Sequence, residues 1–197
     1  MDKFKNFFNE NKKSLYFIFS IALVGLASGI CFYYLISYED KVKCIDFINK
    51  YIMYIKNKNY FQLFLKSFIF NTIILTLIFI CALSITGFIT STFLYFTKNF
   101  ITGLYLTLLL KVTNYYSSSL VYFLPTGIIS IFILSIMLLF SLSISVNLVY
   151  SLFKGKNINF KNINKKYFII YLIMLSIILI LSLYDGFILP KILLNFI

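Results

Sequence analysis

Four blocks of this 197-residue chain contain no charged side chain, and each is long enough to form a membrane span or most of one. They are residues 14–38, 67–97, 112–153 and 167–184. A helix needs about 20 mostly apolar residues to cross a hydrocarbon core of roughly 30 Å. Surface helices of soluble proteins keep charged residues on one face, and these blocks do not. We therefore predict an all-α, polytopic helical bundle in the lipid bilayer.

Composition and charge fit the same class of protein. Hydrophobic residues make up 61% of the chain, against about 45–50% in a typical globular protein. The longest polar segment, 39–66, is too short for a core of its own, so residues 1–197 are predicted to form a single polytopic membrane domain. The net charge is +12, and all the positive charge comes from lysines that lie between the apolar blocks. The positive-inside rule explains this placement better than nucleic-acid binding does, so no nucleic-acid partner is expected.

Two of the blocks are too long for one crossing. Residues 67–97 would form a helix of roughly 45 Å at 1.5 Å per residue. Gly87 offers a break, which predicts a turn or half-helix between Gly87 and Lys98, and Pro125 marks a kink or a helix start. We therefore predict about five spans, with broken or re-entrant segments near Gly87 and Pro125. The predicted spans are residues 14–36, 68–88, 90–111, 126–150 and 167–187, with the polar stretch 113–119 as an interfacial loop.

Lysine distribution also predicts an orientation. The loop 154–166 holds five lysines and no acid, and four lysines precede the first span, so both segments are predicted to be cytoplasmic in a bacterial cell membrane. Segment 39–66 would then lie outside. That segment is itself rich in lysine, although three acids partly balance its charge.

Segment 39–66 carries a helical pattern of its own. Apolar residues recur at three- and four-residue spacing, which predicts an amphipathic helix at the outer membrane surface. They are Val42, Ile45, Ile48, Ile52 and Ile55. A helix that docks a partner protein is the alternative, and the two interpretations are compatible.

The combinations of side chains that most classes of enzyme use for catalysis are absent from this sequence. The chain has no histidine, which removes Ser–His and Cys–His nucleophiles and histidine metal ligands. Asp185 is the only acid after Asp46, so the paired carboxylates of an intramembrane aspartyl protease are missing. No phosphate-binding loop of the G-x-x-x-x-G-K type occurs. We therefore expect no enzymatic activity, no catalytic residues, no cofactor and no metal site.

Three charged residues lie within or beside the spans, where charge is costly and is a sign of function. Lys98 and Lys111 can extend along the helix to the membrane surface. Asp185 cannot, and two alternatives stay open for it: an ion pair with Lys111 or a place in the headgroup region. Gly25 and Gly29 form a G-x-x-x-G motif that permits close helix packing, within the chain or with a partner, which leaves a homo-oligomer open.

Several short motifs, taken in order, resemble the stage II sporulation protein M family over nearly the whole chain. They are Phe68-Ile69-Phe70-Asn71, Gly87, Lys98-Asn99-Phe100 with Gly103, Leu124-Pro125-Thr126-Gly127, and Asp185-Gly186-Phe187-Ile188-Leu189-Pro190. The resemblance and the charge argument together select structural or interaction residues. These candidates are Asn71, Gly87, Lys98, Gly103, Lys111, Pro125, Gly127, Asp185 and Pro190.

The resemblance implies a role as well as a fold. Members of this family act as a membrane scaffold for the stage II sporulation proteins D and P, two bitopic partners that degrade peptidoglycan during forespore engulfment. The implied location is the mother-cell side of the sporulation septum. The competing class is transport, either a small permease or a membrane subunit of a transporter, because helices broken near Gly87 and Pro125 are of the kind that transporters use.

Overall fold

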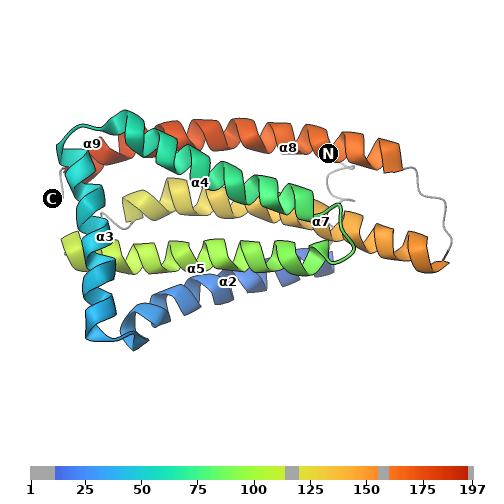
Figure 1. Cartoon of the computed structure of the whole chain (residues 1–197), viewed down its shortest axis with the longest axis horizontal. Helices are drawn as coiled ribbons and strands as arrows, with labels where there is room; N and C mark the ends of the chain where they lie inside the picture. Colours follow the sequence, from blue (N-terminus) through green and yellow to red (C-terminus); the bar gives the residue numbers. More distant parts are fainter. Residues whose placement is uncertain (1–11, 114–119, 155–159, 195–197) are drawn as a thin grey trace.

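The computed structural model describes residues 12–113, 120–154 and 160–194, and this part of the chain is helical with no strand. Five helices are long and apolar enough to cross a membrane, in agreement with the predicted number. They run roughly along the long axis of the molecule, while one further helix crosses their ends at one side (Figure 1). The spans are Lys12–Leu35, Tyr60–Cys81, Gly87–Val112, Leu120–Ser151 and Lys165–Leu193. The protein is thus an all-α, multi-pass membrane bundle.

The helices in chain order are α2 (Lys12–Leu35), α3 (Tyr38–Lys56), α4 (Tyr60–Cys81), α5 (Gly87–Thr113), η1 (Phe123–Gly127), α7 (Ile128–Lys154), α8 (Phe160–Leu183), η2 (Tyr184–Ile188) and α9 (Leu189–Leu193). Both η1 and η2 are single π-helical turns within longer helices. The main core lies between α2, α4, α5, α7 and α8, and many large apolar side chains remain exposed on the outside of the bundle. Such an exterior suits contact with lipid.

The break predicted near Gly87 is a tight turn over residues 82–86. α4 ends at Cys81 and α5 begins at Gly87, where a Cβ atom would overlap the carbonyl oxygen of Cys81. Only glycine fits this close approach. The predicted turn or half-helix between Gly87 and Lys98 is wrong, because these residues form the first three turns of α5. Lys98 therefore lies in the middle of a span.

The break predicted near Pro125 takes the form of η1. The helix already starts at Leu120, so Pro125 lies inside the fourth span and does not begin it. A π-helical turn accommodates proline because one main-chain hydrogen bond is skipped where proline has no N–H to donate. The second π turn, η2, places Asp185 inside the last span, which continues through Pro190 to Leu193.

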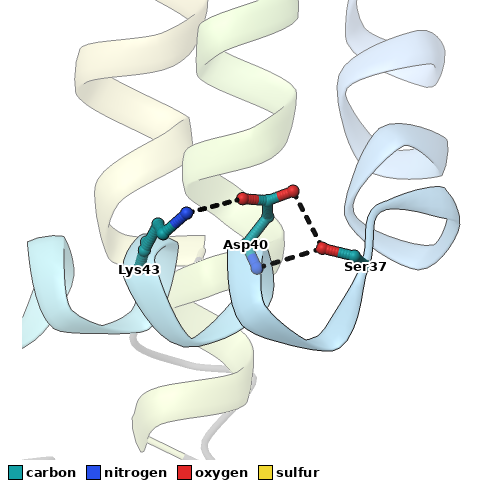
Figure 2. A network of polar contacts seen from close by, with 3 residues as sticks. All are labelled: Ser37, Asp40 and Lys43. Carbon is teal, nitrogen blue, oxygen red and sulfur yellow. Dashed lines mark hydrogen bonds and ion pairs between the residues drawn. The ribbon is translucent and has the colours of Figure 1, made fainter.

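The amphipathic helix predicted in segment 39–66 is confirmed as α3. Ile48, Ile52 and Ile55 are buried against the bundle, whereas Val42 is exposed. Ser37 caps the helix: its Oγ accepts a hydrogen bond from the Asp40 N–H at 3.3 Å and donates one to the Asp40 carboxylate at 2.8 Å (Figure 2). The hydrogen bond from Ser37 and the nearby Lys43 ammonium lower the pKa of Asp40.

α3 lies across the end of the bundle where the described C-terminal residues also lie, opposite the turn that joins α4 to α5 (Figure 1). A short turn then leads into α4, with Lys58 in a left-handed conformation at φ 56°. α4 starts eight residues before the predicted second span, so Lys66 belongs to the helix. Residues 1–11 and 155–159, on which the predicted orientation rests in part, lie outside the described residues. Residues 114–119 of the interfacial loop expected at 113–119 also lie outside them.

Candidate polar site inside the bundle

Asp185 is buried in the bundle and its carboxylate is held by two hydroxyl groups. Ser67 on α4 donates a hydrogen bond to Oδ2, and Thr126 in η1 donates one to Oδ1, both at 2.6 Å. The carboxylate itself belongs to η2, so the two π turns bring Asp185 and Thr126 together. A buried carboxylate needs such donors because it has lost its hydration.

Lys98 is buried on α5, with 7% of its surface exposed. Its Nζ donates a hydrogen bond to Oδ1 of Asn71 at 2.8 Å and lies 4.7 Å from the centre of the Phe70 ring. Asn71 in turn donates from Nδ2 to Oγ of Ser67 at 3.3 Å. An unbroken chain of hydrogen bonds thus runs from Lys98 through Asn71 and Ser67 to Asp185. Lys98 does not extend to the membrane surface, because its ammonium group is buried against this network.

The network borders a cavity of about 470 Å³ between α3, α4, α5, η1 and η2. The polar side chains along its wall include Lys66, Ser67, Asn71, Lys98, Thr126 and Asp185. Three tyrosines, Tyr51, Tyr105 and Tyr122, also line it, and the ring centres of Tyr105 and Tyr122 are 4.6 Å apart. Burial, together with the Asp185 carboxylate, raises the pKa of Tyr51 on α3, so its phenol stays neutral.

Neither alternative for Asp185 agrees with the structure. Lys111 is exposed near the end of α5, and its ammonium lies 5.8 Å from the centre of the Tyr34 ring. Asp185 is buried beside Ser67 and Thr126, so it does not pair with Lys111, and it lies inside the last spanning helix and not at its end. Both interpretations failed because the π turn η2 and the continuation of the helix into α9 could not be read from the sequence.

The glycines of the first span pack within the chain. A Cβ at Gly29 would overlap the carbonyl oxygen of Phe100, and one at Gly103 would overlap that of Leu26. Gly25 is nearly as close, since its Cβ would lie 2.8 Å from that of Asn99. The G-x-x-x-G motif and Gly103 therefore bring α2 and α5 into backbone contact, which accounts for the motif without a second copy of the chain.

Two further candidates, Gly127 and Pro190, directly follow residues that line the cavity but do not border it themselves. Gly127 follows Pro125 in η1, where a Cβ would crowd the Phe123 ring, and Pro190 lies buried in the first turn of α9. The structure thus brings together Asn71, Lys98 and Asp185, and leaves Gly87 and Lys111 elsewhere.

Several residues of the site were missed from the sequence. Ser67 lies four residues before Asn71, and Thr102 lies four residues after Lys98, so each shares a helix face with a residue that was selected. Hydroxyl residues at this spacing in apolar helices were the available signal. Tyr51, Tyr105 and Tyr122 gave no signal, because tyrosine is frequent in this chain.

The arrangement can hold an ionic or polar group, but it offers few kinds of reactive or metal-ligating side chain. The described residues contain no group of three histidine, cysteine or acidic side chains that could hold a metal, and the three cysteines are free. One carboxylate, held by hydroxyl groups, and two ammonium groups are the charges along the described cavity wall.

Comparison with known proteins assigns the family. The family described as stage II sporulation protein M matches residues 15–190, a stretch that reaches from the first spanning helix to the last. Neither a search of curated proteins nor a search of solved structures gives a match. The matched stretch contains every residue of the polar site. The chain belongs to the stage II sporulation protein M family and is a sporulation-related, multi-pass membrane protein.

Proposed function

We propose that this chain is the membrane scaffold, or anchor subunit, of a septal peptidoglycan-degrading complex needed for forespore engulfment. The observation that carries the proposal is the match to a sporulation family across all five spanning helices. Stage II sporulation proteins D and P are the proposed partners and supply the hydrolytic chemistry. The chain holds them at the mother-cell side of the septum.

The buried site supports a non-catalytic role. Asp185 has a hydroxyl group on each carboxylate oxygen, and the other described acids, Glu39, Asp40 and Asp46, lie on α3. Acid–base hydrolysis by carboxylates needs two such groups close together with different pKa values. The family is also not a known enzyme family. We therefore assign the hydrolysis to the partners.

α3 is the proposed contact surface for the partners' domains outside the membrane. Its inner face is buried on the bundle, while Lys43, Asp46, Lys50 and Met53 are exposed on its outer side. The predicted orientation puts this helix outside the cytoplasm, where the peptidoglycan lies. The exposed apolar faces of the spanning helices are available to the single spans of bitopic partners.

The test is deletion of the gene in a sporulating host. Engulfment should stall after the septum forms, with both hydrolases present at normal level but no longer concentrated at the septum by fluorescence microscopy. Reintroduction of the wild-type gene should restore engulfment and the concentration of the hydrolases at the septum. Normal septal placement of the hydrolases without this chain would sink the scaffold proposal.

Transport is the second candidate, favoured by the polar cavity beside the two π turns. Transporters commonly place binding sites near the middle of the membrane, where helices are interrupted. Uptake of a soluble substrate by the purified chain in liposomes, abolished by Lys98→Met, would favour this function over the scaffold.

A further inference from the structure

We propose that the cavity between α3, α4 and α5 binds the phosphate group of a membrane lipid, with Lys98 and Lys66 as its ligands. The proposal adds a ligand-binding site to the protein and does not depend on the scaffold function. It rests on three features of the cavity: its unmet hydrogen-bond donors, its charge and its apolar rim.

Lys98 has donors to spare. An ammonium group carries three N–H donors, and among the described residues Asn71 accepts one of them. The rest of the group faces the Phe70 ring and the cavity. A buried ammonium is costly unless its donors are satisfied, so an anionic acceptor in the cavity would remove this cost.

The charges along the described cavity wall favour an anion. Lys66 also lines the cavity, with its ammonium 3.8 Å from the centre of the Tyr54 ring. Against these two cations stands one carboxylate, Asp185, whose oxygens already accept hydrogen bonds from Ser67 and Thr126. Basic pockets between spanning helices are typical sites for lipid phosphates.

The rim of the cavity favours a lipid over a soluble anion. Phe47, Phe70 and Ile101 come from three different helices, line the cavity and are exposed at its edge. Phe70 and Ile101 lie in the middle of their spans, so the opening faces the lipid-exposed exterior of the bundle. The volume of about 470 Å³ is within the range of small-molecule sites. A phosphate headgroup would fill the polar part of the cavity, while the acyl or prenyl chains of the lipid pass over the apolar rim.

The test is native mass spectrometry of the full chain in uncharged detergent, with four probes. They are phosphatidylglycerol, polyprenyl phosphate, diacylglycerol with the same acyl chains as the phosphatidylglycerol, and inorganic phosphate. One molecule of a phosphate-bearing lipid should stay bound, and the better of the two identifies the lipid class. Equal retention of diacylglycerol would show that the phosphate group is not recognised and would overturn the proposal. Binding of inorganic phosphate as tight as that of either lipid would overturn the assignment of the ligand to a lipid.

Two variants and a control locate the site. Lys66→Gln removes an exposed charge and should weaken lipid binding about fivefold without affecting folding. Lys98→Gln removes the buried donor and should weaken binding by more than about tenfold. Lys111→Gln removes an exposed charge from the same helix as Lys98, away from the cavity, and should leave binding unchanged. If Lys98→Gln fails to fold, the lipid binding of Lys66→Gln tests the proposal alone. An equal loss of lipid binding in Lys66→Gln and Lys111→Gln would contradict the proposal.

Discussion

Asp185 shows how one ionisable residue is kept inside this bundle. Moving a carboxylate out of water is costly, and here two short hydrogen bonds from Ser67 and Thr126 replace part of its hydration. The Lys98 ammonium is connected to it through Asn71, so the opposite charges share one network. Removal of one member leaves its partners buried and unsatisfied, and that penalty is larger than the net value of the bond.

This network predicts coupling between Lys98 and Asp185. The free energies of unfolding of Lys98→Met, Asp185→Leu and the double variant, measured by denaturant titration in mixed micelles, should be non-additive by about 0.5–3 kcal/mol. The matched cycle of Lys111→Met with Asp185→Leu should be additive, because the Lys111 ammonium lies near the Tyr34 ring and is not part of the network. Additivity in the first cycle, or coupling only in the second, would show that the network does not act as a unit.

Helix packing between α2 and α5 depends on three glycines. Helices in lipid gain little from the hydrophobic effect, so close backbone contact is a main source of their association. Gly25 and Gly29 on α2 meet the backbone of α5, and Gly103 on α5 meets the backbone of α2. The same pair of helices positions Lys98, which directly precedes Asn99 at the contact.

Gly29→Leu should therefore destabilise the protein, by about 1–3 kcal/mol or more, because the added side chain has no space beside Phe100. Ala27→Leu adds a similar volume at an exposed position of the same helix and should have little effect. Denaturant titration in the same micelles measures both. Equal stability of the two variants would contradict the α2–α5 contact.

At the scale of the whole molecule, the two ends of the bundle differ. One end carries α3 and α9, and the other carries the turn between α4 and α5 (Figure 1). The cavity borders the first end, since Phe47 of α3 and Leu189 of α9 line it. α3 ties the first end together, since Ile48 and Ile52 pack with Leu108 of α5, and Ile55 packs with Leu63 of α4 and Leu193 of α9. This end combines a surface helix with the cavity, so the proposed partner binding and the proposed lipid binding would occur on the same side of the membrane.

The class of fold could be predicted from the sequence because charge-free blocks and their length depend on the bilayer alone. The amphipathic helix α3 was also readable, from the spacing of its isoleucines. The ends of the helices could not be predicted from the sequence. Lys66 lies within α4, and the two π turns continue a helix through Pro125 and Asp185.

Three residues of the candidate site were selected from the sequence, but their geometry was not predicted. Asn71, Lys98 and Asp185 were each selected, yet the selected partner of Asp185 was Lys111. Their true arrangement depends on long-range packing between α4, α5, η1 and η2. Local spacing along one helix does not contain that information, although Ser67 and Asn71 share a face.

We propose that this chain holds the septal hydrolases through the outer side of α3. The most direct measurement is the quantity of the stage II sporulation proteins D and P that co-purify with the tagged chain from sporulating cells. Both should co-purify with the wild type and with a control carrying Lys111→Gln and Lys191→Gln, two exposed lysines on helices other than α3. Lys43→Gln with Lys50→Gln on α3 should reduce the yield several-fold at equal chain level. Absence of both partners from the wild-type preparation, with the chain intact at the septum, would contradict this scaffold role.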